Sequence, residues 1–457
     1  MIVMSKKIVV IGGGPAGYAA AVRASKLGGN VTLIEKDRLG GVCTNRGCIP
    51  TKAMAYIASI VENIKNSRRF GINIKEYSVD FKDIVRARDR VVKRLSMGVE
   101  HLLRENNVEI VKGIGKIVGS KTVEVNGRQI KCDDIIIATG SRPVMLKIPG
   151  IENIYAKMGD DIFDLTEIPE NILIVGGGAI GVEFSYIFNS LDRNVTIVEL
   201  MPHILPNIDE EIALNLQKIL IKSGVNIYTN TVVSKFEKSG DKAVAYLSNN
   251  EKIESDLVII SVGRVANSDG LGLEKIDVKT GRKGVILVDE HMRTSVKNIY
   301  AAGDVAGKYF LAYTAYSEGI VAAENAMGLD TKINYKSVPI AIFSEPEVAS
   351  VGLNEKEARE KFGEIKVGRA PFIINGRALA MNMYNGFIKV IVNKNNKIIG
   401  IHMLGPYVSE LIHEAALILN NNLKIEDLAE GTLYIHPSLS ETLKEAALAC
   451  LNKAIHV

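Results

Sequence analysis

The sequence predicts a multidomain α/β fold, and two observations carry that prediction. Residues 8–35 and 172–199 align without a gap, and ten of their 28 positions are identical. Each copy holds a β-branched run, a G-x-G-x-x-G turn, a helix-length segment and a second β-branched run, which predicts a strand-turn-helix-strand unit. From residue 337 onward strands alternate with amphipathic helices, and GFIKVIVNKNNKIIGIHMLG predicts a hairpin that turns at residues 393–396.

The glycines of the two turns have separate physical roles. The first permits a tight turn, the second lets the backbone approach a pyrophosphate, and the third lets helix and strand pack closely. Glu35 and Glu199 each fall 18 residues after the last glycine, where a carboxylate can accept hydrogen bonds from a ribose diol. Two dinucleotide sites are therefore predicted. The glycines are Gly12, Gly14 and Gly17 in the first copy and Gly176, Gly178 and Gly181 in the second.

Strand-like runs that end in glycine follow each copy. DDIIIATGS covers residues 133–141 and SDLVIISVG covers 255–263, so we expect each nucleotide domain to close its sheet in the same way. In NIYAAGDVAG, Asp304 follows a short strand and a glycine, where a carboxylate can bind a ribityl or ribose hydroxyl or can simply shape a turn. The helical spacing of apolar residues in 79–106 predicts a packing helix.

Length, composition and charge exclude several classes of protein. The 457 residues are 47% hydrophobic and 24% charged, with a net charge of +4, which suits a globular chain of about three domains. No long basic run indicates nucleic acid, and no apolar stretch approaches the roughly 20 residues of a membrane span. The amino terminus runs directly into strand-like sequence, and the start at Met1 or Met4 is left open. We expect a cytoplasmic protein with small-molecule partners.

Two of the four cysteines lie five positions apart in GGVCTNRGCIPTKA. Because the cytosol disfavours structural disulfides, Cys43 and Cys48 are expected to be catalytic or metal-binding. Zinc would need two further soft ligands, and the sequence offers no second C-x-x-C or clustered His/Cys pair, so no metal is expected. Pro50 predicts a helix that begins near Cys48, where the positive helix end favours a thiolate. Cys132 and Cys450 are isolated and are expected to be small buried side chains.

A candidate base lies near the carboxyl terminus. His436, in HPSLSE, is followed five residues later by Glu441. The carboxylate could orient the imidazole while the other ring nitrogen takes a thiol proton. A histidine before proline in a loop is also a common structural feature, and the sequence alone leaves both interpretations open.

The first repeat, the two-cysteine stretch, ATGS, the second repeat and AAGD, in this order, resemble the flavoprotein disulfide reductase family over essentially the whole chain. Within it, GGVCTNRGCIPTKA is most similar to the lipoamide dehydrogenases, and FSEPEVASVG, INGRALA and HPSLSE point the same way. The resemblance implies a glutathione-reductase-like fold with two Rossmann-like domains, binding FAD and NAD, and an α+β domain that forms a homodimer. The chain is accordingly divided into an FAD-binding domain (1–147), an NAD-binding domain (148–268), a central domain completing the FAD site (269–336) and an interface domain (337–457).

The resemblance also implies roles for individual residues. Cys48 lies against the flavin, and Cys43 is the interchange thiol. His436 and Glu441 act on the cysteines of the other subunit. Lys52 and Glu183 are expected to meet near the reactive edge of the flavin and to serve both catalysis and cofactor binding. The other implied cofactor-binding residues outside the two turns are Gly115, Thr139, Gly140, Ser141, Val233, Gly263, Asp304, Phe310, Leu311, Ala312 and Tyr313.

By this resemblance the chain oxidises dihydrolipoamide to lipoamide with NAD⁺, and its partners are the lipoyl domains of 2-oxoacid dehydrogenase or glycine-cleavage complexes. NADP is disfavoured on physical grounds, because Glu199 is a carboxylate and Leu200 to His203 contain no lysine or arginine. The alternatives are a glutathione-type or mercuric reductase, or a flavin-bound subunit without lipoamide activity. Tyr313 and Tyr434 stand where relatives often have histidine, which leaves their pocket contacts open.

Overall fold

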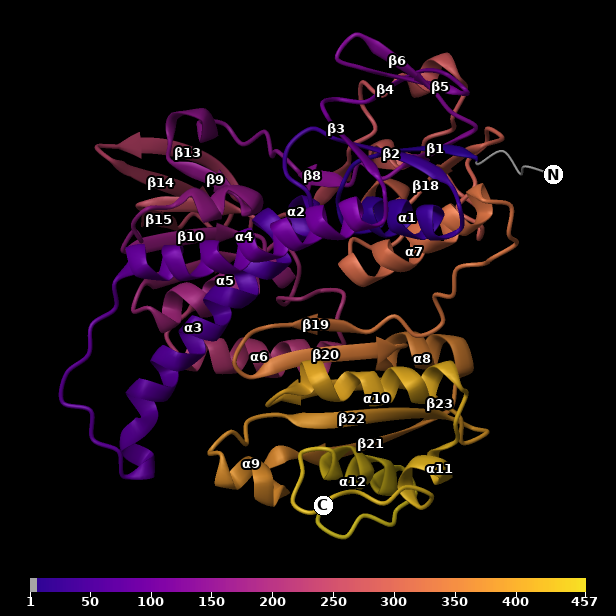
Figure 1. Ribbon diagram of the computed structural model, residues 1–457. Coiled ribbons are helices and arrows are strands. Elements are labelled where there is room, and N and C mark those ends of the chain that lie inside the picture. Colours follow the sequence, from indigo (N-terminus) through magenta and orange to yellow (C-terminus); the bar gives the residue numbers. More distant parts are fainter. Residues whose placement is uncertain (1–5) are drawn as a thin grey trace.

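The computed structural model describes residues 6–457, so the choice between Met1 and Met4 as the start lies outside the described residues. Two nucleotide-type units occupy the upper part of Figure 1, and the C-terminal sheet with its helices lies below them. Every helix within residues 6–457 is too short or too polar to span a bilayer.

The first nucleotide unit is a parallel sheet with the strand order β18-β7-β1-β2-β3. Helices α1 (Pro15–Lys26) and α7 (Ala312–Ala326) lie side by side against it (Figure 1). The edge strand β18 comes from far along the chain, so this unit is completed only after the second repeat. Its strands are β1 (Lys7–Ile11), β2 (Asn30–Glu35), β3 (Glu109–Lys112), β7 (Asp134–Ile137) and β18 (Ile299–Ala301).

The second unit repeats this arrangement with the parallel order β12-β11-β10-β16-β9. Strand β16 pairs with β10 as β7 pairs with β1, which confirms that both sheets are extended in the same way. The helices are α5 (Ala179–Ser190) and α6 (Glu210–Lys222). The strands are β9 (Ala156–Met158), β10 (Asn171–Val175), β11 (Asn194–Val198), β12 (Asn226–Tyr228) and β16 (Leu257–Ile260).

Small antiparallel sheets and 3₁₀ turns are inserted between the main elements along the chain. The sheets are formed by β4 (Lys116–Gly119), β5 (Thr122–Val125) and β6 (Arg128–Lys131); by β13 (Val233–Ser239), β14 (Lys242–Leu247) and β15 (Lys252–Ser255); and by β8 (Ser141–Pro143) with β17 (Arg264–Ala266). The 3₁₀ turns are η1 (Ser67–Phe70), η2 (Ile151–Asn153), η3 (Gly159–Asp164), η4 (Leu273–Lys275), η5 (Arg282–Gly284), η6 (Asp304–Ala306) and η7 (Phe372–Ile374).

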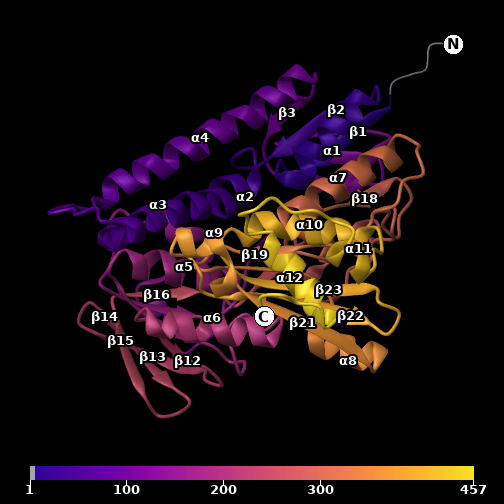
Figure 2. The same cartoon turned by 90° about the horizontal axis from the view of Figure 1, so that it is seen from below.

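Three helices follow the first repeat. The short α2 (Gly41–Arg46) leads into α3 (Cys48–Asn66), so the predicted helix start at Cys48 is confirmed. Helix α4 (Phe81–Glu105) confirms the helix predicted from the apolar spacing of 79–106. Helices α3 and α4 pack together and extend away from the first sheet toward α5 (Figures 1 and 2).

The C-terminal part is an antiparallel sheet with the order β19-β20-β23-β22-β21. Strands β22 and β23 form the predicted hairpin around residues 393–396. The strands are β19 (Ile340–Ile342), β20 (Glu347–Gly352), β21 (Ile365–Pro371), β22 (Phe387–Asn393) and β23 (Ile398–Gly405). The helices are α8 (Glu355–Phe362), α9 (Gly376–Ala380), α10 (Val408–Asn420), α11 (Ile425–Ala429) and α12 (Glu441–Cys450).

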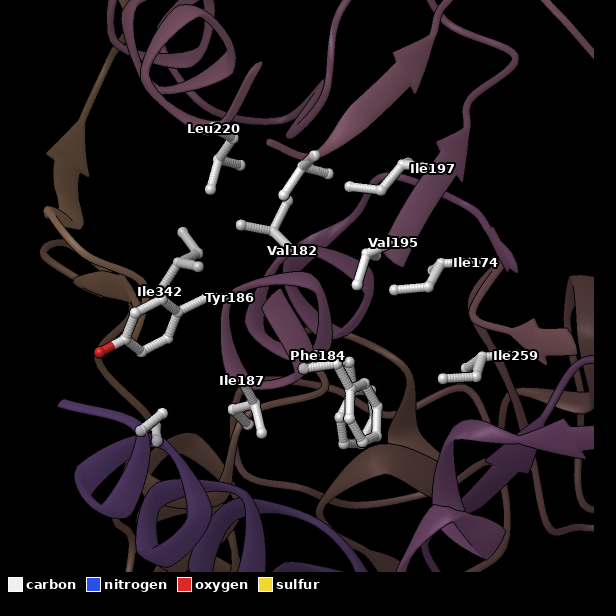
Figure 3. Close-up of a cluster of buried hydrophobic side chains, with 14 of the residues drawn as sticks. Ile174, Val182, Phe184, Tyr186, Ile187, Val195, Ile197, Leu220, Ile259 and Ile342 are labelled. Atoms are coloured by element: carbon white, nitrogen blue, oxygen red, sulfur yellow. The ribbon is translucent and has the colours of Figure 1, made fainter. Parts of the chain in front are cut away.

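One buried apolar cluster joins the second nucleotide unit to its neighbours. Figure 3 shows this cluster, which contains Phe184 and Ile187 of α5, Ile259 of the sheet, Leu220 of α6 and Ile342 of the C-terminal part. Each of these five side chains is at most 2% exposed. Because removing apolar surface from water stabilises contacts in proportion to buried area, this cluster holds α5 between the sheet and the C-terminal part.

Candidate functional site

In the first glycine turn, only the position expected to face a ligand has space for an added side-chain atom. Gly12 has a φ of +105°, and a Cβ there would lie 2.3 Å from the carbonyl oxygen of Ala138. At Gly17 a Cβ would lie 1.8 Å from the Gly12 oxygen, whereas at Gly14 the nearest heavy atom is 3.7 Å away. The chain's own backbone therefore requires the first and third glycines. The second leaves room for a phosphate to approach.

The second turn repeats these features. Gly176 has a φ of +107°, and a Cβ there would lie 2.6 Å from the Ser261 oxygen. At Gly181 a Cβ would lie 2.1 Å from the Gly176 oxygen, but at Gly178 nothing lies within 4 Å. Helices α1 and α5 carry no acidic residue in their first turns, so their positive ends are free of a competing side-chain charge.

The two predicted ribose carboxylates are held identically. Glu35 accepts the Gly13 N–H at 2.6 Å and the Asp37 N–H at 2.8 Å. Glu199 accepts the N–H groups of the corresponding Gly177 and Met201 at the same two distances, 2.6 and 2.8 Å. Each carboxylate oxygen takes one backbone donor and keeps lone pairs for a further one. Both turns therefore fit a dinucleotide.

Asp304 lies where the carboxyl ends of the first sheet meet the second unit. It follows β18 and accepts the Ser141 hydroxyl at 2.5 Å, while Arg264 donates to the Ser141 oxygen at 2.7 Å. Burial raises the pKa of Asp304 above its usual value. The Thr139 hydroxyl donates to the backbone oxygen of Asn267 at 2.7 Å, which ties the ATGS stretch to the chain after β17.

The remaining cofactor-binding candidates lie on several elements. Gly140 and Gly263 have φ values of +69° and +107°, and a Cβ at either would have nothing within 4 Å. Gly115 packs closely on Ile11, whereas Val233 is 7% exposed within an apolar cluster of the second unit. Leu311 caps helix α7, which begins at Ala312, and Phe310 and Tyr313 are 41% and 42% exposed.

The two cysteines lie on consecutive helices. Cys43 belongs to α2, and Cys48 is the first residue of α3; both thiols are free and half-buried. A hydrogen bond from Cys43 lowers the pKa of Cys48, and the Lys52 ammonium acts in the same direction against the opposing effect of burial. That hydrogen bond and burial raise the pKa of Cys43. Cys48 is therefore the more acidic thiol of the pair.

Lys52 and Glu183 are 131 residues apart in sequence, and their predicted meeting is confirmed. The Lys52 Nζ atom lies 2.9 Å from both carboxylate oxygens of Glu183, which is 5% exposed. The Phe343 N–H donates to the same carboxylate at 3.1 Å, and Lys52 Nζ lies 4.5 Å from the centre of the Phe343 ring. This ion pair crosses from α3 to α5 and joins the dithiol helix to the second unit.

His436 and Glu441 form a pair at the other end of the molecule. Nδ1 of His436 lies 2.9 Å from Oε1 of Glu441, and the Ser438 N–H donates to Oε2 at 2.8 Å. Against the effect of burial, the Ser438 N–H and the His436 side chain hold the pKa of Glu441 below its usual value. The His436 side chain is 80% exposed. Helix α12, which begins at Glu441, lies far from α2 in Figure 1, so one chain does not bring this pair to its own cysteines.

Tyr18 and Tyr316 are neighbours of the dithiol that the sequence did not reveal. The Tyr18 hydroxyl donates to the Tyr316 hydroxyl at 2.9 Å across a separation of 298 residues. Burial raises the pKa of both phenols, and their electrostatic interaction with the Cys43 side chain acts in the same direction. The Tyr434 hydroxyl, near the His436 pair, donates to Glu414 at 2.5 Å. No group of three or more His, Cys, Asp and Glu side chains in the described part of the chain could hold a metal ion.

Comparison with known protein families decides the class. Residues 6–319 match the family model described as pyridine nucleotide-disulphide oxidoreductase, and residues 338–447 match its dimerisation domain. The chain belongs to this family. It is therefore a flavoprotein disulfide oxidoreductase with FAD and NAD(H) as its cofactors, and its fold is the expected glutathione-reductase-like one. The residues of both glycine turns fit these two cofactors.

Curated relatives extend over nearly the whole chain. A dihydrolipoyl dehydrogenase of Bacillus subtilis is 39% identical, with 98% of this chain and 99% of that protein covered. One from Thermus scotoductus is 41% identical, with 98% of each covered. Among solved structures, LpdA of Mycobacterium tuberculosis has a TM-score of 0.88 at 27% identity, covering 97% of this chain and 99% of that one. The HOCl-induced flavoprotein disulfide reductase RclA of Escherichia coli also has a TM-score of 0.88, at 29% identity with 96% and 99% covered.

Proposed function

We propose that the chain is a dihydrolipoyl dehydrogenase, which oxidises dihydrolipoamide to lipoamide and reduces NAD⁺. The observation that carries this proposal is the Cys43 and Cys48 pair, with Cys48 at a helix start beside the Lys52–Glu183 ion pair. The full-length similarity to curated dihydrolipoyl dehydrogenases supports the choice of substrate.

The cysteines exchange sulfur bonds with the substrate. In the oxidised protein Cys43 and Cys48 form a disulfide, and a substrate thiolate attacks the sulfur of Cys43. Cys48 leaves as a thiolate, which the helix start and Lys52 stabilise. The second substrate thiol then attacks the substrate sulfur bonded to Cys43, which releases lipoamide and leaves both cysteines reduced. When bound, FAD supplies an acceptor for this electron pair and a hydride donor for NAD⁺.

His436 supplies the base that generates the substrate thiolate. Glu441 orients the Nδ1 side of the imidazole, so the Nε2 side is available to take a thiol proton. Because His436 is exposed and distant from the cysteines of its own chain, we propose that it acts on those of a second copy in a homodimer. The match to the dimerisation domain supports this arrangement.

Glu199 underlies the proposed preference for NAD⁺ over NADP⁺. Its carboxylate is 7% exposed and faces the second turn through Gly177. A 2′-phosphate would meet this negative charge without a compensating cation in residues 200–203. The same reasoning disfavours an NADPH-dependent glutathione-type or mercuric reductase.

The proposed function also implies protein partners and a division of the chain into domains. We infer that the dithiol carriers are lipoyl domains of a 2-oxoacid dehydrogenase or glycine-cleavage complex, encountered in the cytoplasm. The domain boundaries at residues 147, 268 and 336 are part of the same proposal. The order of the sheets supports them, because β18 returns to the first unit after the second unit ends.

A substrate panel on the purified protein tests the activity. We expect rapid turnover with NAD⁺ and dihydrolipoamide, and with NADH and lipoamide. NADPH with glutathione disulfide and NADPH with Hg(II) serve as the competing reactions. Strong NADPH-dependent turnover with no lipoamide reaction would overturn the proposal, and flavin binding without turnover would favour the non-catalytic alternative.

Subunit exchange tests the shared site. Cys43→Ser and His436→Gln homodimers should each be inactive alone and should recover part of the activity when mixed, because one hybrid site keeps both intact groups. Native mass spectrometry would show that exchange took place. Exchange without recovered activity would contradict a site built from two chains.

A further inference from the structure

A fully buried lysine lies where the second nucleotide unit meets the C-terminal sheet. Lys389 of β22 is 2% exposed, and its Nζ atom lies 2.9 Å from Asp209, 3.0 Å from Glu211 and 2.7 Å from Glu355. Arg369 of β21 bridges Glu211 and Glu355 at 2.8 and 3.1 Å. A buried ammonium ion is costly unless it is paired, so this lysine strongly constrains the positions of its three carboxylates.

The carboxylates belong to different parts of the molecule. Asp209 and Glu211 lie at the start of α6 in the second nucleotide unit, whereas Glu355 begins α8 in the C-terminal part. Figures 1 and 2 show α6 alongside the C-terminal sheet, and α6 contacts β23. The ion pairs of Lys389 with Asp209 and Glu211 therefore join the C-terminal sheet to the second nucleotide unit. Its ion pair with Glu355 lies within the C-terminal part.

The segment that ends at Asp209 starts after Glu199 and passes against the nucleotide turn. After Glu199, the chain returns so that the Leu205 N–H donates to the Gly177 oxygen at 2.8 Å. The Ile204 side chain lies against Gly177, where a Cβ would be 3.0 Å from its Cγ2 atom. The Ile208 N–H donates to the Leu205 oxygen at 2.9 Å.

The path from the turn to the lysine is short and mostly buried, although Pro206 is half-buried and Asn207 is exposed. Ile204 is fully buried, Leu205 and Ile208 are 3% and 6% exposed, and Asp209 is 2% exposed. Close-packed buried segments transmit displacement because they have little free space to absorb it. A shift of Asp209 would thus move the residues that support Gly177.

We propose that Lys389 is a positioning residue for NAD⁺ binding: from the C-terminal sheet it holds Asp209, and through residues 204–208 it supports the Gly177 turn, whose N–H donates to Glu199. The effect is on affinity for NAD⁺ and leaves the dithiol chemistry unchanged. This inference rests on the assignment of NAD⁺ to the second turn in the proposed function.

Three substitutions around the same lysine separate positioning from general stability. Asp209→Asn removes the charge that links Lys389 to the nucleotide segment, and Glu211→Gln weakens the same link at a side chain that is 35% exposed. Glu355→Gln is the matched control, because it removes a carboxylate 2.7 Å from the same ammonium group but within the C-terminal part.

The first measurement is direct binding of NAD⁺ to the FAD-loaded protein by isothermal titration calorimetry. We expect Asp209→Asn to raise Kd by about five- to twenty-fold, Glu211→Gln to raise it less, and Glu355→Gln to change it by less than about two-fold. Steady-state KM for NAD⁺ should follow the same order, with kcat at saturating NAD⁺ unchanged within about two-fold. Hydrogen exchange over residues 200–208 should be faster in Asp209→Asn and unchanged in Glu355→Gln.

The outcomes distinguish this inference from the proposed function. Wild-type protein that binds no NAD⁺ would contradict the proposed function itself. Wild-type binding with equal Kd in all three variants, or an equal loss in Glu355→Gln and Asp209→Asn, would overturn only the positioning role. If Asp209→Asn does not fold, the comparison of Glu211→Gln with Glu355→Gln decides the question.

Discussion

The two repeats build the same turn and then use it differently. After β2 the chain returns so that the Gly40 N–H donates to the Gly13 oxygen at 2.9 Å, and after β11 the Leu205 N–H donates to the Gly177 oxygen at 2.8 Å. Leu39 packs against Gly13 in the first turn as Ile204 packs against Gly177 in the second. The two turns are thus supported by equivalent contacts, one backbone hydrogen bond and one apolar side chain at each.

The repeats diverge directly after this contact. The first continues into α2, which carries Cys43, and then into the helix that begins at Cys48. The second continues to Asp209 and the buried Lys389. The difference shows how a duplicated binding turn acquires separate roles: one copy positions redox chemistry, and the other is anchored to the C-terminal sheet.

The largest expected effect removes the chemistry from the first repeat. Cys48→Ser should lower the rate of dihydrolipoamide oxidation by at least about 10³-fold, because the leaving thiolate is lost. Steady-state kinetics measure the rate, and visible absorbance confirms that FAD stays bound. Cys132→Ser is the control, because that thiol is 5% exposed in an apolar cluster, and its rate should match the wild type. A Cys48→Ser protein with normal activity would refute the assigned dithiol.

The second prediction separates the two turns. Gly17→Ala and Gly181→Ala each place a Cβ against backbone, 1.8 and 2.1 Å from a carbonyl oxygen. We expect Gly17→Ala to be purified without FAD, and Gly181→Ala to keep FAD but to bind NAD⁺ at least about tenfold more weakly. Absorbance and calorimetry report the two losses. The reverse pattern of losses would show that the cofactor assignments are exchanged.

Gly178→Ala sharpens that comparison. Its Cβ would have nothing within 4 Å, so the free energy of unfolding should stay within about 0.5 kcal/mol of the wild type. The affinity for NAD⁺ should nevertheless fall, because the methyl group occupies the space through which the phosphate approaches. Chemical denaturation and calorimetry measure the two quantities. Unchanged affinity would mean that no phosphate binds at this turn.

Glu199→Gln is expected to have a smaller effect on nucleotide choice. Loss of the charge should reduce the preference for NAD⁺ over NADP⁺ by about tenfold, since a hydrogen bond to a charged group contributes about 1.5–3 kcal/mol. The ratio of kcat/KM for the two nucleotides measures this. Glu35→Gln, the equivalent change in the first repeat, should leave that ratio unchanged.

The last prediction concerns stability, not activity, at the junction of the repeats. Glu345 lies near Glu62 of α3 and Tyr186 of α5. Burial raises the pKa of Glu345 most, and the negative charges of Glu347 and Glu62 raise it further, from 4.5 to about 7. The folded chain therefore holds a proton that the unfolded chain releases near pH 4.5, so this contribution to stability is lost as pH rises to about 7.

Glu345→Gln should remove that loss. The stability of the variant relative to wild type should increase by about 1–3 kcal/mol from pH 5 to pH 8. Thermal unfolding at both pH values measures the difference. A pH-independent difference between variant and wild type would show that Glu345 is charged throughout this range.

Much of the fold followed from the sequence because its signals are local. The glycine turns, their flanking strands, the helix start at Cys48 and the 393–396 hairpin each depend on a few neighbouring residues. The Tyr18–Tyr316 and Asp209–Lys389 contacts had no such signal, because their partners are separated by 298 and 180 residues. The meeting of Lys52 with Glu183 was expected only through the family resemblance.

By itself the sequence determined two dinucleotide turns, a pair of cysteines at a helix start and a separate C-terminal domain. These features arise from backbone sterics, namely the positive φ that glycine allows in the turns and the fixed φ of Pro50 in the first turn of α3, which act over a few residues. Only the tertiary structure decided that Cys43 and Lys52 also lower the pKa of Cys48, that Glu183 pairs with Lys52, and that Lys389 anchors the second repeat. Those outcomes depend on burial and on charges brought together from distant segments, and neither is encoded in a local pattern.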